Sequence, residues 1–428
     1  MFLSRRFFPY FIVQCLGALN DNIYKNVLLL MVAWASVSQL PMPVGLFVNL
    51  AAALFILPFL LFSAHAGHLA DCRDKAWLIR RLKWLELLLM SAAALAICSQ
   101  SYLVMLVLLF LMGTQSAYFG PVKYALLPQA LEPGELVQGN AWVEVGTFLA
   151  ILMGTLGAGV IMSAGQASAI AAVAVVSFAL IGLVAGQFIP DLPPVSGGQK
   201  RKGIGQIIKA VWRQKNLFVA IMAISWFWFA GAVYLTQFPN FTRIELYATP
   251  ALVSILLALF SVGIGVGSFA SVRLAHRKVE LGLVVPGAMG LMLFGCAFDA
   301  GLMWVEPPVG SGSYLLGEFL ATGRHWGLLL SLFMVGVCGG IYIVPLYSFI
   351  QAEARPAERA QVIAANNIFN ALFMIASAVL AIVLLELFGW SIPELFLLIA
   401  LLNLLVLLLL YSTSLHFRLA FIRYLFGK

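Results

Sequence analysis

The chain of 428 residues contains twelve apolar stretches, each about as long as a helix that crosses a lipid bilayer. Only 10% of the residues are charged, whereas a soluble protein has about a quarter. We therefore expect an all-α integral membrane protein with twelve transmembrane helices. The expected spans are residues 8–34, 44–63, 77–98, 102–127, 137–162, 167–188, 216–238, 251–272, 281–304, 326–350, 360–388 and 393–411.

The basic residues are distributed unevenly between the loops of this arrangement. If the spans alternate in direction, one side of the membrane receives nearly all of them, and the opposite loops carry only Arg243 and Arg324. Because cytoplasmic loops are enriched in Lys and Arg, we expect both termini in the cytoplasm. A missed or additional span would disrupt this segregation. The basic side carries Arg5, Arg6, Arg73, Lys75, Arg80, Arg81, Lys200, Arg201, Lys202, Lys209, Arg213, Lys215, Arg273, Arg277, Lys278, Arg355, Arg359, Arg418, Arg423 and Lys428.

The composition also excludes several classes of function. The net charge of +8 does not indicate nucleic-acid binding, because the basic residues lie in short loops between spans. The five cysteines have no metal-binding or redox spacing, and we expect no cofactor. No nucleophile and base converge in a pattern that would indicate an enzyme. Arg5 and Arg6 precede a full-length apolar stretch without a small-residue cleavage site, so the first span is expected to be its own insertion signal.

The chain divides into two similar halves of six spans. Residues 190–202 are rich in Pro, Gly and Ser and then basic, which indicates a linker, and residues 204–212 are expected to form an amphipathic helix at the membrane surface. Gly120-Pro121 in the first half and Val344-Pro345 in the second precede similar series of polar residues. Two parallel six-span repeats are typical of one large transporter class, with the substrate site between the halves. The expected division is residues 1–189, a linker at 190–215, residues 216–415 and an amphipathic tail at 416–428.

The first span contains an unusual polar cluster. Asn20, Asp21 and Asn22 are consecutive, and Lys25 shares a helix face with Asp21 at i,i+4. A charge inside a bilayer costs about 2.5–3.5 kcal/mol near its centre, so such groups usually face a bundle interior or a water-filled cavity. The alternative is a self-neutralised pair that only stabilises helix packing.

Charges well inside the other spans lie in the first half, whereas Asp299, Glu386 and Glu394 of the second half are near span ends. Glu86, Lys123 and Glu144 are in spans three, four and five, and Lys123 and Glu144 lie at similar depth, where they could pair. The second half has amides, hydroxyls and an aromatic run at 226–229 instead. A substrate with a charged headgroup and a long apolar tail fits this asymmetry. The embedded polar residues of the second half are Thr236, Gln237, Asn240, Gln351, Asn366, Asn367 and Asn370.

The segment after span two, GHLADCRDK at residues 67–75, resembles the cytoplasmic loop signature Gly-x-Leu-Ala-Asp-Arg-x-Gly-Arg-Lys of the major facilitator superfamily. The resemblance implies that Gly67 permits close helix contact. It also implies that Asp71 accepts hydrogen bonds from the N–H groups of a helix end and pairs with Arg73 or another basic group, as part of a cytoplasmic gate. Cys72 and Asp74 depart from the signature, where Arg and Gly are usual, and Asp74 is counted with the gate.

A narrower resemblance is to the bacterial lysophospholipid transporter family, and it covers nearly the whole chain. The segments that carry it are GALNDN (17–22), AYFGPVKY (117–124), GNAWVE (139–144), VPL (344–346) with Gln351 and Asn366, SWFW (225–228) and LTQFPN (235–240). This resemblance implies a protein of the bacterial inner membrane that flips lysophosphatidylethanolamine and lysophosphatidylglycerol from the outer to the inner leaflet without an ion gradient. It also implies a possible cytoplasmic partner, an acyltransferase/acyl-carrier synthetase that restores the missing acyl chain.

We therefore predict a monomeric lysophospholipid transporter, surrounded by membrane lipids, that works by alternating access. Two alternatives remain open. One is a proton-coupled transporter of another amphiphilic solute, with Asp21 or Glu144 as the proton site. The other is a non-transporting membrane anchor for a lipid-remodelling enzyme. The predicted roles are headgroup recognition by Asp21, phosphate binding by Lys123, orientation of Lys123 by Glu144, and further substrate contacts from Asn20, Asn22, Lys25, Gln237, Gln351 and Asn366.

Overall fold

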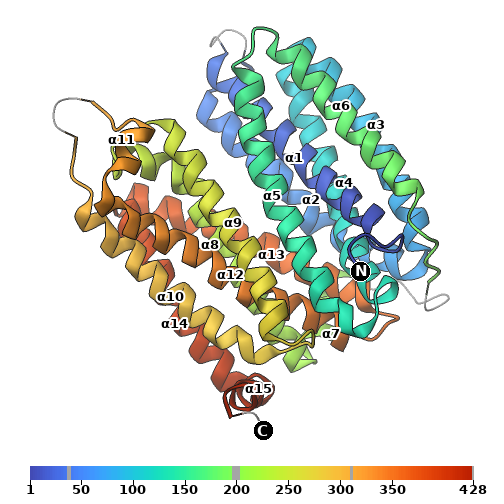
Figure 1. Ribbon diagram of the computed structural model, residues 1–428. Helices are drawn as coiled ribbons and strands as arrows, with labels where there is room; N and C mark the ends of the chain where they lie inside the picture. Colours follow the sequence, from blue (N-terminus) through green and yellow to red (C-terminus); the bar gives the residue numbers. More distant parts are fainter. Residues whose placement is uncertain (36–39, 195–202, 309–311, 427–428) are drawn as a thin grey trace. The chain divides into compact units, whose positions relative to one another are not determined.

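The protein is described by a computed structural model that covers residues 1–35, 40–194, 203–308 and 312–426. These residues are almost entirely helical (Figure 1). The long helices are α1 (Phe8–Trp34), α2 (Val44–Cys72), α3 (Lys75–Cys98), α4 (Tyr102–Ala130), α5 (Leu136–Met162), α6 (Ala167–Gln187), α8 (Lys215–Ile244), α9 (Pro250–Leu274), α10 (Val284–Gly301), α12 (Trp326–Glu353), α13 (Arg359–Ile382) and α14 (Ile392–Thr413). The short helices are α7 (Ile204–Trp212), α11 (Leu316–Ala321) and α15 (Leu415–Phe426).

Ten of the helices in the described ranges are long and apolar enough to cross a membrane by length and composition. The other two long helices, α1 and α3, have 27 and 24 residues, which is sufficient length. Their apolar runs are interrupted, in α1 by Asp21 and Lys25 and in α3 by Arg81, Lys83 and Glu86. The expectation of twelve spans therefore rests on α1 and α3, and their crossing stays a prediction.

The chain forms two compact units. Unit 1 comprises residues 1–139, 149–213 and 350–371, and unit 2 comprises residues 140–148, 214–349 and 372–428. The main division between Arg213 and Gln214 lies inside the predicted 190–215 segment, although short pieces of α5, α12 and α13 group with the unit of the other half. Of the predicted linker, residues 195–202 lie outside the described residues. The helix expected at 204–212 is present as α7, and its position at the membrane surface stays a prediction.

Unit 1 is built around an apolar cluster to which α1, α2, α3, α4, α5 and α6 all contribute. In this unit α2 packs along α4, α3 packs along α4 and α6, and α1 packs along α6. Tyr24 of α1 is fully buried in the cluster, and its hydroxyl donates to the carbonyl oxygen of Met105 on α4 at 2.9 Å. Gly113 permits the close approach of α2 and α4, since a Cβ there would lie 2.6 Å from the carbonyl oxygen of Phe55. This packing fixes the rotation of α1, and therefore the direction in which its polar side chains point.

Unit 2 contains a close crossing between α9 and α12. Gly263 and Gly267 of α9 face Gly336 and Gly340 of α12. A Cβ on Gly263 would lie 3.1 Å from the Cα of Gly336, and a Cβ on Gly336 would lie 3.0 Å from the Cα of Gly263. A Cβ on Gly267 would overlap the carbonyl oxygen of Val337. Small residues at this spacing are typical of tightly packed membrane helices, because they let two backbones come into contact.

Replacing Gly267 with alanine is therefore expected to destabilise unit 2. The added methyl group must displace backbone atoms of α12, which costs about 1–3 kcal/mol by analogy with overpacked cores. Gly231→Ala is the matched control, since a Cβ at Gly231 of α8 meets nothing within 4 Å. Thermal unfolding of the purified protein in detergent should show a lower midpoint for Gly267→Ala than for Gly231→Ala. Equal midpoints would show that the crossing is not tight.

Candidate functional site

A polar strip lies on one face of α1 in unit 1. It consists of Asp21, Asn22, Lys25 and Asn26, which fall within about 140° of one another at 3.6 residues per turn. All four side chains are partly exposed, although the helix is surrounded by apolar residues. The Lys25 ammonium donates to Asn22 Oδ1 at 3.3 Å, and the Asn26 amide donates to Thr155 Oγ1 of α5 at 3.2 Å. The strip thus presents one acid, one base and two amides to an accessible surface.

Asp21 and Lys25 do not make the ion pair that their spacing predicts. Among the described residues, Asp21 Oδ2 accepts a hydrogen bond from the Ser116 hydroxyl of α4 at 2.6 Å. The Lys25 ammonium lies over the Phe55 ring of α2, at 5.6 Å from its centroid. The two charges are therefore held apart by different neighbours, and each remains available to a ligand of the opposite charge.

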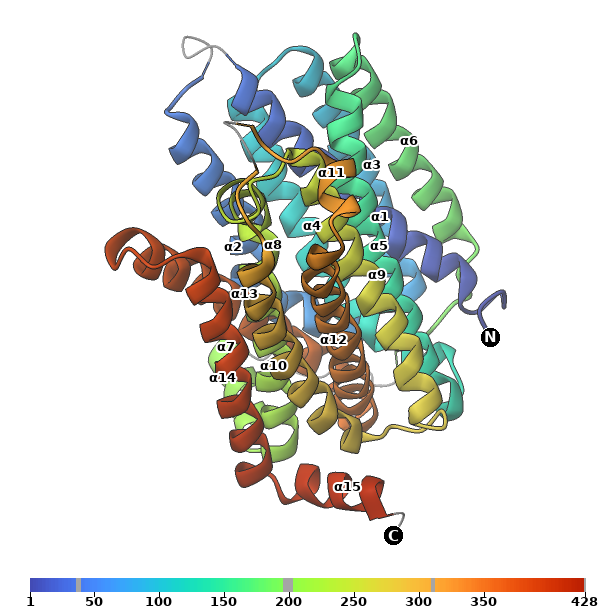
Figure 2. The ribbon, with the colours of Figure 1, turned by 60° about the vertical axis from the view of Figure 1, so that its left-hand side comes forward.

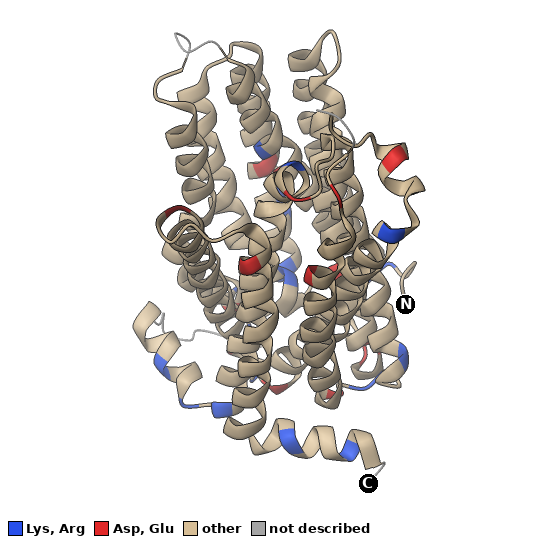
Figure 3. Cartoon of the chain, turned by 90° about the vertical axis from the view of Figure 1, so that its left-hand side faces the viewer, with Lys and Arg blue, Asp and Glu red and all other residues tan. Residues whose placement is uncertain are grey.

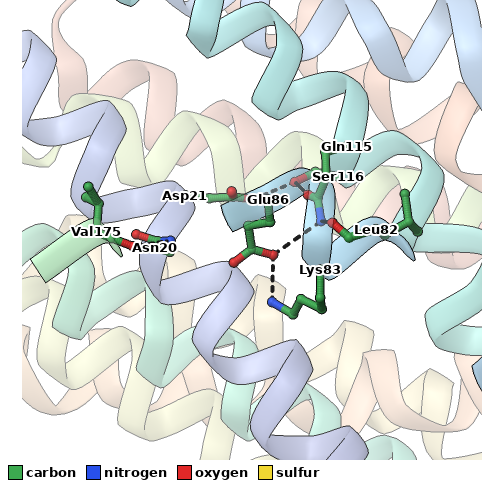
Figure 4. A network of polar contacts seen from close by, with 8 residues as sticks. All are labelled: Asn20, Asp21, Leu82, Lys83, Glu86, Gln115, Ser116 and Val175. Carbon is green, nitrogen blue, oxygen red and sulfur yellow. Dashed lines mark hydrogen bonds and ion pairs between the residues drawn. The ribbon is translucent and has the colours of Figure 1, made fainter. Parts of the chain in front are cut away.

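A fully buried ion pair on α3 lies near Asp21 of the strip (Figure 4). The Lys83 ammonium is 2.6 Å from Glu86 Oε2, and the two side chains, both on α3, are 1% and 3% exposed. Two glycines make room for the long Lys83 side chain. A Cβ on Gly17 of α1 or Gly182 of α6 would lie 3.3 or 3.0 Å from the Lys83 nitrogen.

Two residues of α4 connect this ion pair to Asp21. The Gln115 amide donates to Glu86 Oε2 at 3.2 Å, and the neighbouring Ser116 hydroxyl reaches Asp21 at 2.6 Å and Gln115 Oε1 at 3.4 Å. A hydroxyl has one proton, and the shorter contact indicates that it is directed to Asp21. The chain of contacts from Lys83 to Asp21 therefore crosses from the buried interior of unit 1 to the accessible strip.

Asn20 takes no part in the strip. It is fully buried, and its amide donates to the carbonyl oxygen of Val175 on α6 at 3.0 Å, on the side of α1 away from Ser116 (Figure 4). The sequence prediction grouped Asn20 with Asp21 and Asn22 because they are consecutive. Consecutive residues of a helix point about 100° apart, and the packing of α1 on α6 directs Asn20 toward α6.

Sequence reasoning recognised Glu86 but missed Lys83, Gln115 and Ser116. Lys83 has a clear signal, since it lies inside the third span, three residues before Glu86, where two helix side chains meet. Gln115 and Ser116 have no such signal, because neutral polar residues are common in membrane helices. Their importance comes only from the neighbours that α4 brings to them.

The other predicted substrate residues are distributed over both units. In unit 1, Lys123 of α4 is partly exposed, and Gln351 of α12 and Asn366 of α13 are buried. Neither amide atom of Asn366 is hydrogen bonded to another described residue. In unit 2, Glu144 of α5 is fully buried and Gln237 of α8 is partly exposed. The pairing of Lys123 with Glu144, and the contacts of these five residues with a substrate, stay predictions.

The segment that resembles the cytoplasmic loop signature is helical as far as Cys72 and belongs to α2, not to a loop. Gly67 lies against α13, because a Cβ there would be 2.7 Å from the Ala364 side chain and 2.8 Å from the Ala360 carbonyl oxygen. Asp71 accepts hydrogen bonds from the backbone N–H groups of Ala360 and Gln361, at 2.9 and 3.2 Å. Both the close helix contact and the contact with a helix end are therefore present within unit 1.

Arg73 does not pair with Asp71 as predicted, and Asp74, for which no partner was predicted, bonds to two backbone N–H groups. Among the described residues Arg73 makes no ion pair with Asp71, and its guanidinium lies 5.9 Å from the centroid of the Trp77 ring. Asp74 caps the start of α3 by accepting from the Trp77 N–H at 2.7 Å, and its other oxygen accepts from the Leu192 N–H at 2.7 Å. Asp74, which departs from the signature, thus attaches the segment after α6 to the beginning of α3.

In the part of the chain that the structure describes, no group of three His, Cys, Asp or Glu side chains could hold a metal ion. The strip instead provides a carboxylate, an ammonium and amides inside an apolar bundle. These groups suit a ligand that carries charges of both signs together with apolar parts.

The sequence profile of the Major Facilitator Superfamily matches residues 10–312. The lysophospholipid transporter LplT of Enterobacter sp. (strain 638) is 26% identical over 312 residues, which are 71% of this chain and 70% of that protein. LplT of Yersinia enterocolitica is 26% identical over 365 residues, which are 82% of this chain and 80% of that protein.

Solved structures show the same fold. The human organic anion transporter MFSD10 has a TM-score of 0.72 at 16% identity, with 95% of this chain and 99% of that chain covered. The transporter FucP in its outward conformation has a TM-score of 0.70 at 13% identity, with 96% of this chain and 100% of that chain covered. At these identities the likeness concerns the fold alone.

Proposed function

Since the chain belongs to the major facilitator superfamily and is a membrane transporter, we propose that its substrates are lysophospholipids, which it moves from the outer to the inner leaflet of the bacterial inner membrane. The observation that carries this proposal is the α1 polar strip, which offers Asp21 and Lys25 separately to a ligand. The relatives named lysophospholipid transporter support the choice of substrate.

The headgroup of lysophosphatidylethanolamine carries an ammonium and a phosphate, and we assign them to different residues. Asp21, oriented by Ser116, meets the ammonium. Lys123 is seven residues after Ser116, on the same face of α4 and about 10.5 Å further along it at 1.5 Å per residue, so its long side chain can reach toward the phosphate. Asn22 and Lys25 add contacts on the α1 side. The headgroup of lysophosphatidylglycerol has a phosphate and no ammonium, so we assign its contacts to the basic groups and the amides only.

The proposal includes twelve spans with both termini in the cytoplasm, in accordance with the basic residues on one side. Alternating access would then open and close the contact of Gly67 and Asp71 with α13. A cytoplasmic acyltransferase/acyl-carrier synthetase is the enzyme class that would use the flipped product, because that product lacks one acyl chain.

The test is flipping of lysophosphatidylethanolamine in proteoliposomes without an ion gradient. The lipid carries an isotopic label in its headgroup, so that its ammonium stays intact, and albumin extracts whatever remains in the outer leaflet. Asp21→Asn removes a charge-assisted contact, and we expect flipping to slow by about tenfold to a hundredfold. Asp299→Asn is the control, since Asp299 is an acidic residue of a membrane helix in unit 2.

Three outcomes would contradict the proposal. If the wild type transports only after a proton gradient is imposed, the protein is a coupled transporter and Asp21 becomes a candidate proton site. If Asp21→Asn flips at the wild-type rate while Asp299→Asn does not, the strip is not in the substrate path. If lysophospholipid repair in cells continues without any flipping, the protein is an anchor for an enzyme.

A further inference from the structure

Unit 2 has a cavity of about 320 Å³ where α14 ends and α15 begins. Its polar lining comes from two distant parts of the chain, with Lys215 and Asn216 at the start of α8 and Thr413 and His416 at the junction of α14 and α15. The junction is firmly attached to α8, because the buried Ser414 hydroxyl donates to Asn216 Oδ1 at 3.0 Å. That contact leaves the Asn216 amide N–H groups available as donors to a molecule in the cavity.

The lining of the cavity includes one basic residue, Lys215, and no acidic residue. Lys215 is exposed, and both α8 and α15 begin at the edge of the cavity. The first turn of a helix has N–H groups without intrahelical acceptors, which adds partial positive charge. Helix α15 contains Arg418 and Arg423 and no acidic residue, so only basic residues are marked on it in Figure 3.

Helix α15 has the two-faced pattern of a helix that lies on a membrane surface. It turns across the end of the apolar helix α14 and does not continue it (Figure 2). One face packs on unit 2, where Tyr424 and Ala420 contact Gly282. The opposite face exposes apolar side chains at helical spacing, which are Leu415, Leu419, Ile422 and Phe426, at 58%, 44%, 38% and 71%. An exposed apolar stripe beside arginines is typical of helices that rest between headgroups and acyl chains.

The cavity and the stripe share residues. Leu415 and Leu419 belong to the exposed stripe and also line the cavity beside Lys215. A ligand in the cavity would therefore have its anionic part against Lys215 and His416 and its apolar part against the stripe. Free phosphate satisfies only the first of these conditions, whereas an anionic phospholipid satisfies both.

We propose that this cavity binds the headgroup phosphate of an anionic phospholipid from the leaflet at the end of α14, with its acyl chains along Leu415 and Leu419. The bound lipid would hold α15 to α8 and α14. This site lies in unit 2, whereas the α1 polar strip lies in unit 1, and it does not depend on which substrate is transported.

The experiment measures lipid binding to the purified full chain in detergent by native mass spectrometry. Phosphatidylglycerol and zwitterionic phosphatidylcholine are titrated separately against the wild type, Lys215→Ala, Leu419→Ser and Lys278→Ala. The control residue Lys278 is an exposed base elsewhere in unit 2. We expect Lys215→Ala to weaken phosphatidylglycerol binding by about tenfold, as for the loss of one charge-assisted contact, and Lys278→Ala to leave it unchanged. Leu419→Ser should also weaken it, and all variants should bind phosphatidylcholine weakly and equally.

Several results would overturn the assignment. Equal affinity of the wild type for both lipids would remove the role of the anionic headgroup. Wild-type affinity in Lys215→Ala would place the lipid elsewhere. Displacement of phosphatidylglycerol by inorganic phosphate in molar excess, with no effect of Leu419→Ser, would make this a site for a soluble anion.

Unchanged thermal unfolding of lipid-free Lys215→Ala would show that its weaker binding is not caused by misfolding.

Discussion

Replacing Lys83 with methionine is expected to destabilise the protein by about 3–5 kcal/mol, because it leaves Glu86 buried without its cation. The Lys83 and Glu86 side chains are 1% and 3% exposed, so water cannot replace the lost partner. Gln115 still donates to Glu86 Oε2, but an amide hydrogen bond does not neutralise a carboxylate. The measurement is the thermal unfolding midpoint of the purified variant in detergent, together with its yield from membranes.

The double variant Lys83→Met with Glu86→Gln tests this explanation. It removes both charges, retains an amide near Gln115, and should recover most of the stability that the single variant loses. Arg81→Met is the matched control, since Arg81 is an exposed base on the same helix and its loss should cost at most about 1 kcal/mol. If the double variant is no more stable than Lys83→Met, the cost comes from the shape of the Lys83 side chain, which fills the space beside Gly17 and Gly182.

Replacing Asp71 with asparagine is expected to loosen the start of α13. The two carboxylate oxygens accept from the N–H groups of Ala360 and Gln361 and from the Gln361 side-chain amide at 3.3 Å. An asparagine directs its own N–H₂ group at one of these donors, and it loses the favourable charge at the N-terminus of a helix. We expect hydrogen exchange at Ala360 and Gln361 to accelerate by about tenfold to a hundredfold.

The neighbouring residue Asp74 supplies the control for this experiment. Asp74→Asn removes contacts with the N–H groups of Trp77 and Leu192, so it should accelerate exchange at those positions and not at Ala360. Measuring lysophospholipid flipping with the same preparations shows whether the contact of Asp71 with α13 acts as a gate or is only structural. If the contact is a gate, Asp71→Asn should change the rate of flipping by a factor similar to the change in the rate of hydrogen exchange at Ala360. Faster exchange at Ala360 with unchanged flipping would argue against the gate.

Much of the fold was predictable, because length and apolarity are properties of local sequence. The expected span at residues 137–162 differs from α5 by one residue at its start, and α7 begins and ends where its amphipathic pattern does. Boundaries were less accurate where a helix continues beyond the apolar stretch. Helix α2 extends to Cys72, nine residues beyond the expected end of the second span, because the contacts of Gly67 and Asp71 with α13 stabilise its polar last turns.

The sequence by itself determined that this protein is an α-helical membrane protein with a costly polar cluster in its first helix. Only the tertiary structure decided which partner each polar group has. Asp21 bonds to Ser116, 95 residues away, and not to Lys25 four residues on, while Asn20 bonds to Val175, 155 residues away. The spacing of residues on one helix shows which side chains share a face. The rotation of that helix, which sets their partners, comes from packing against helices that are distant in the sequence.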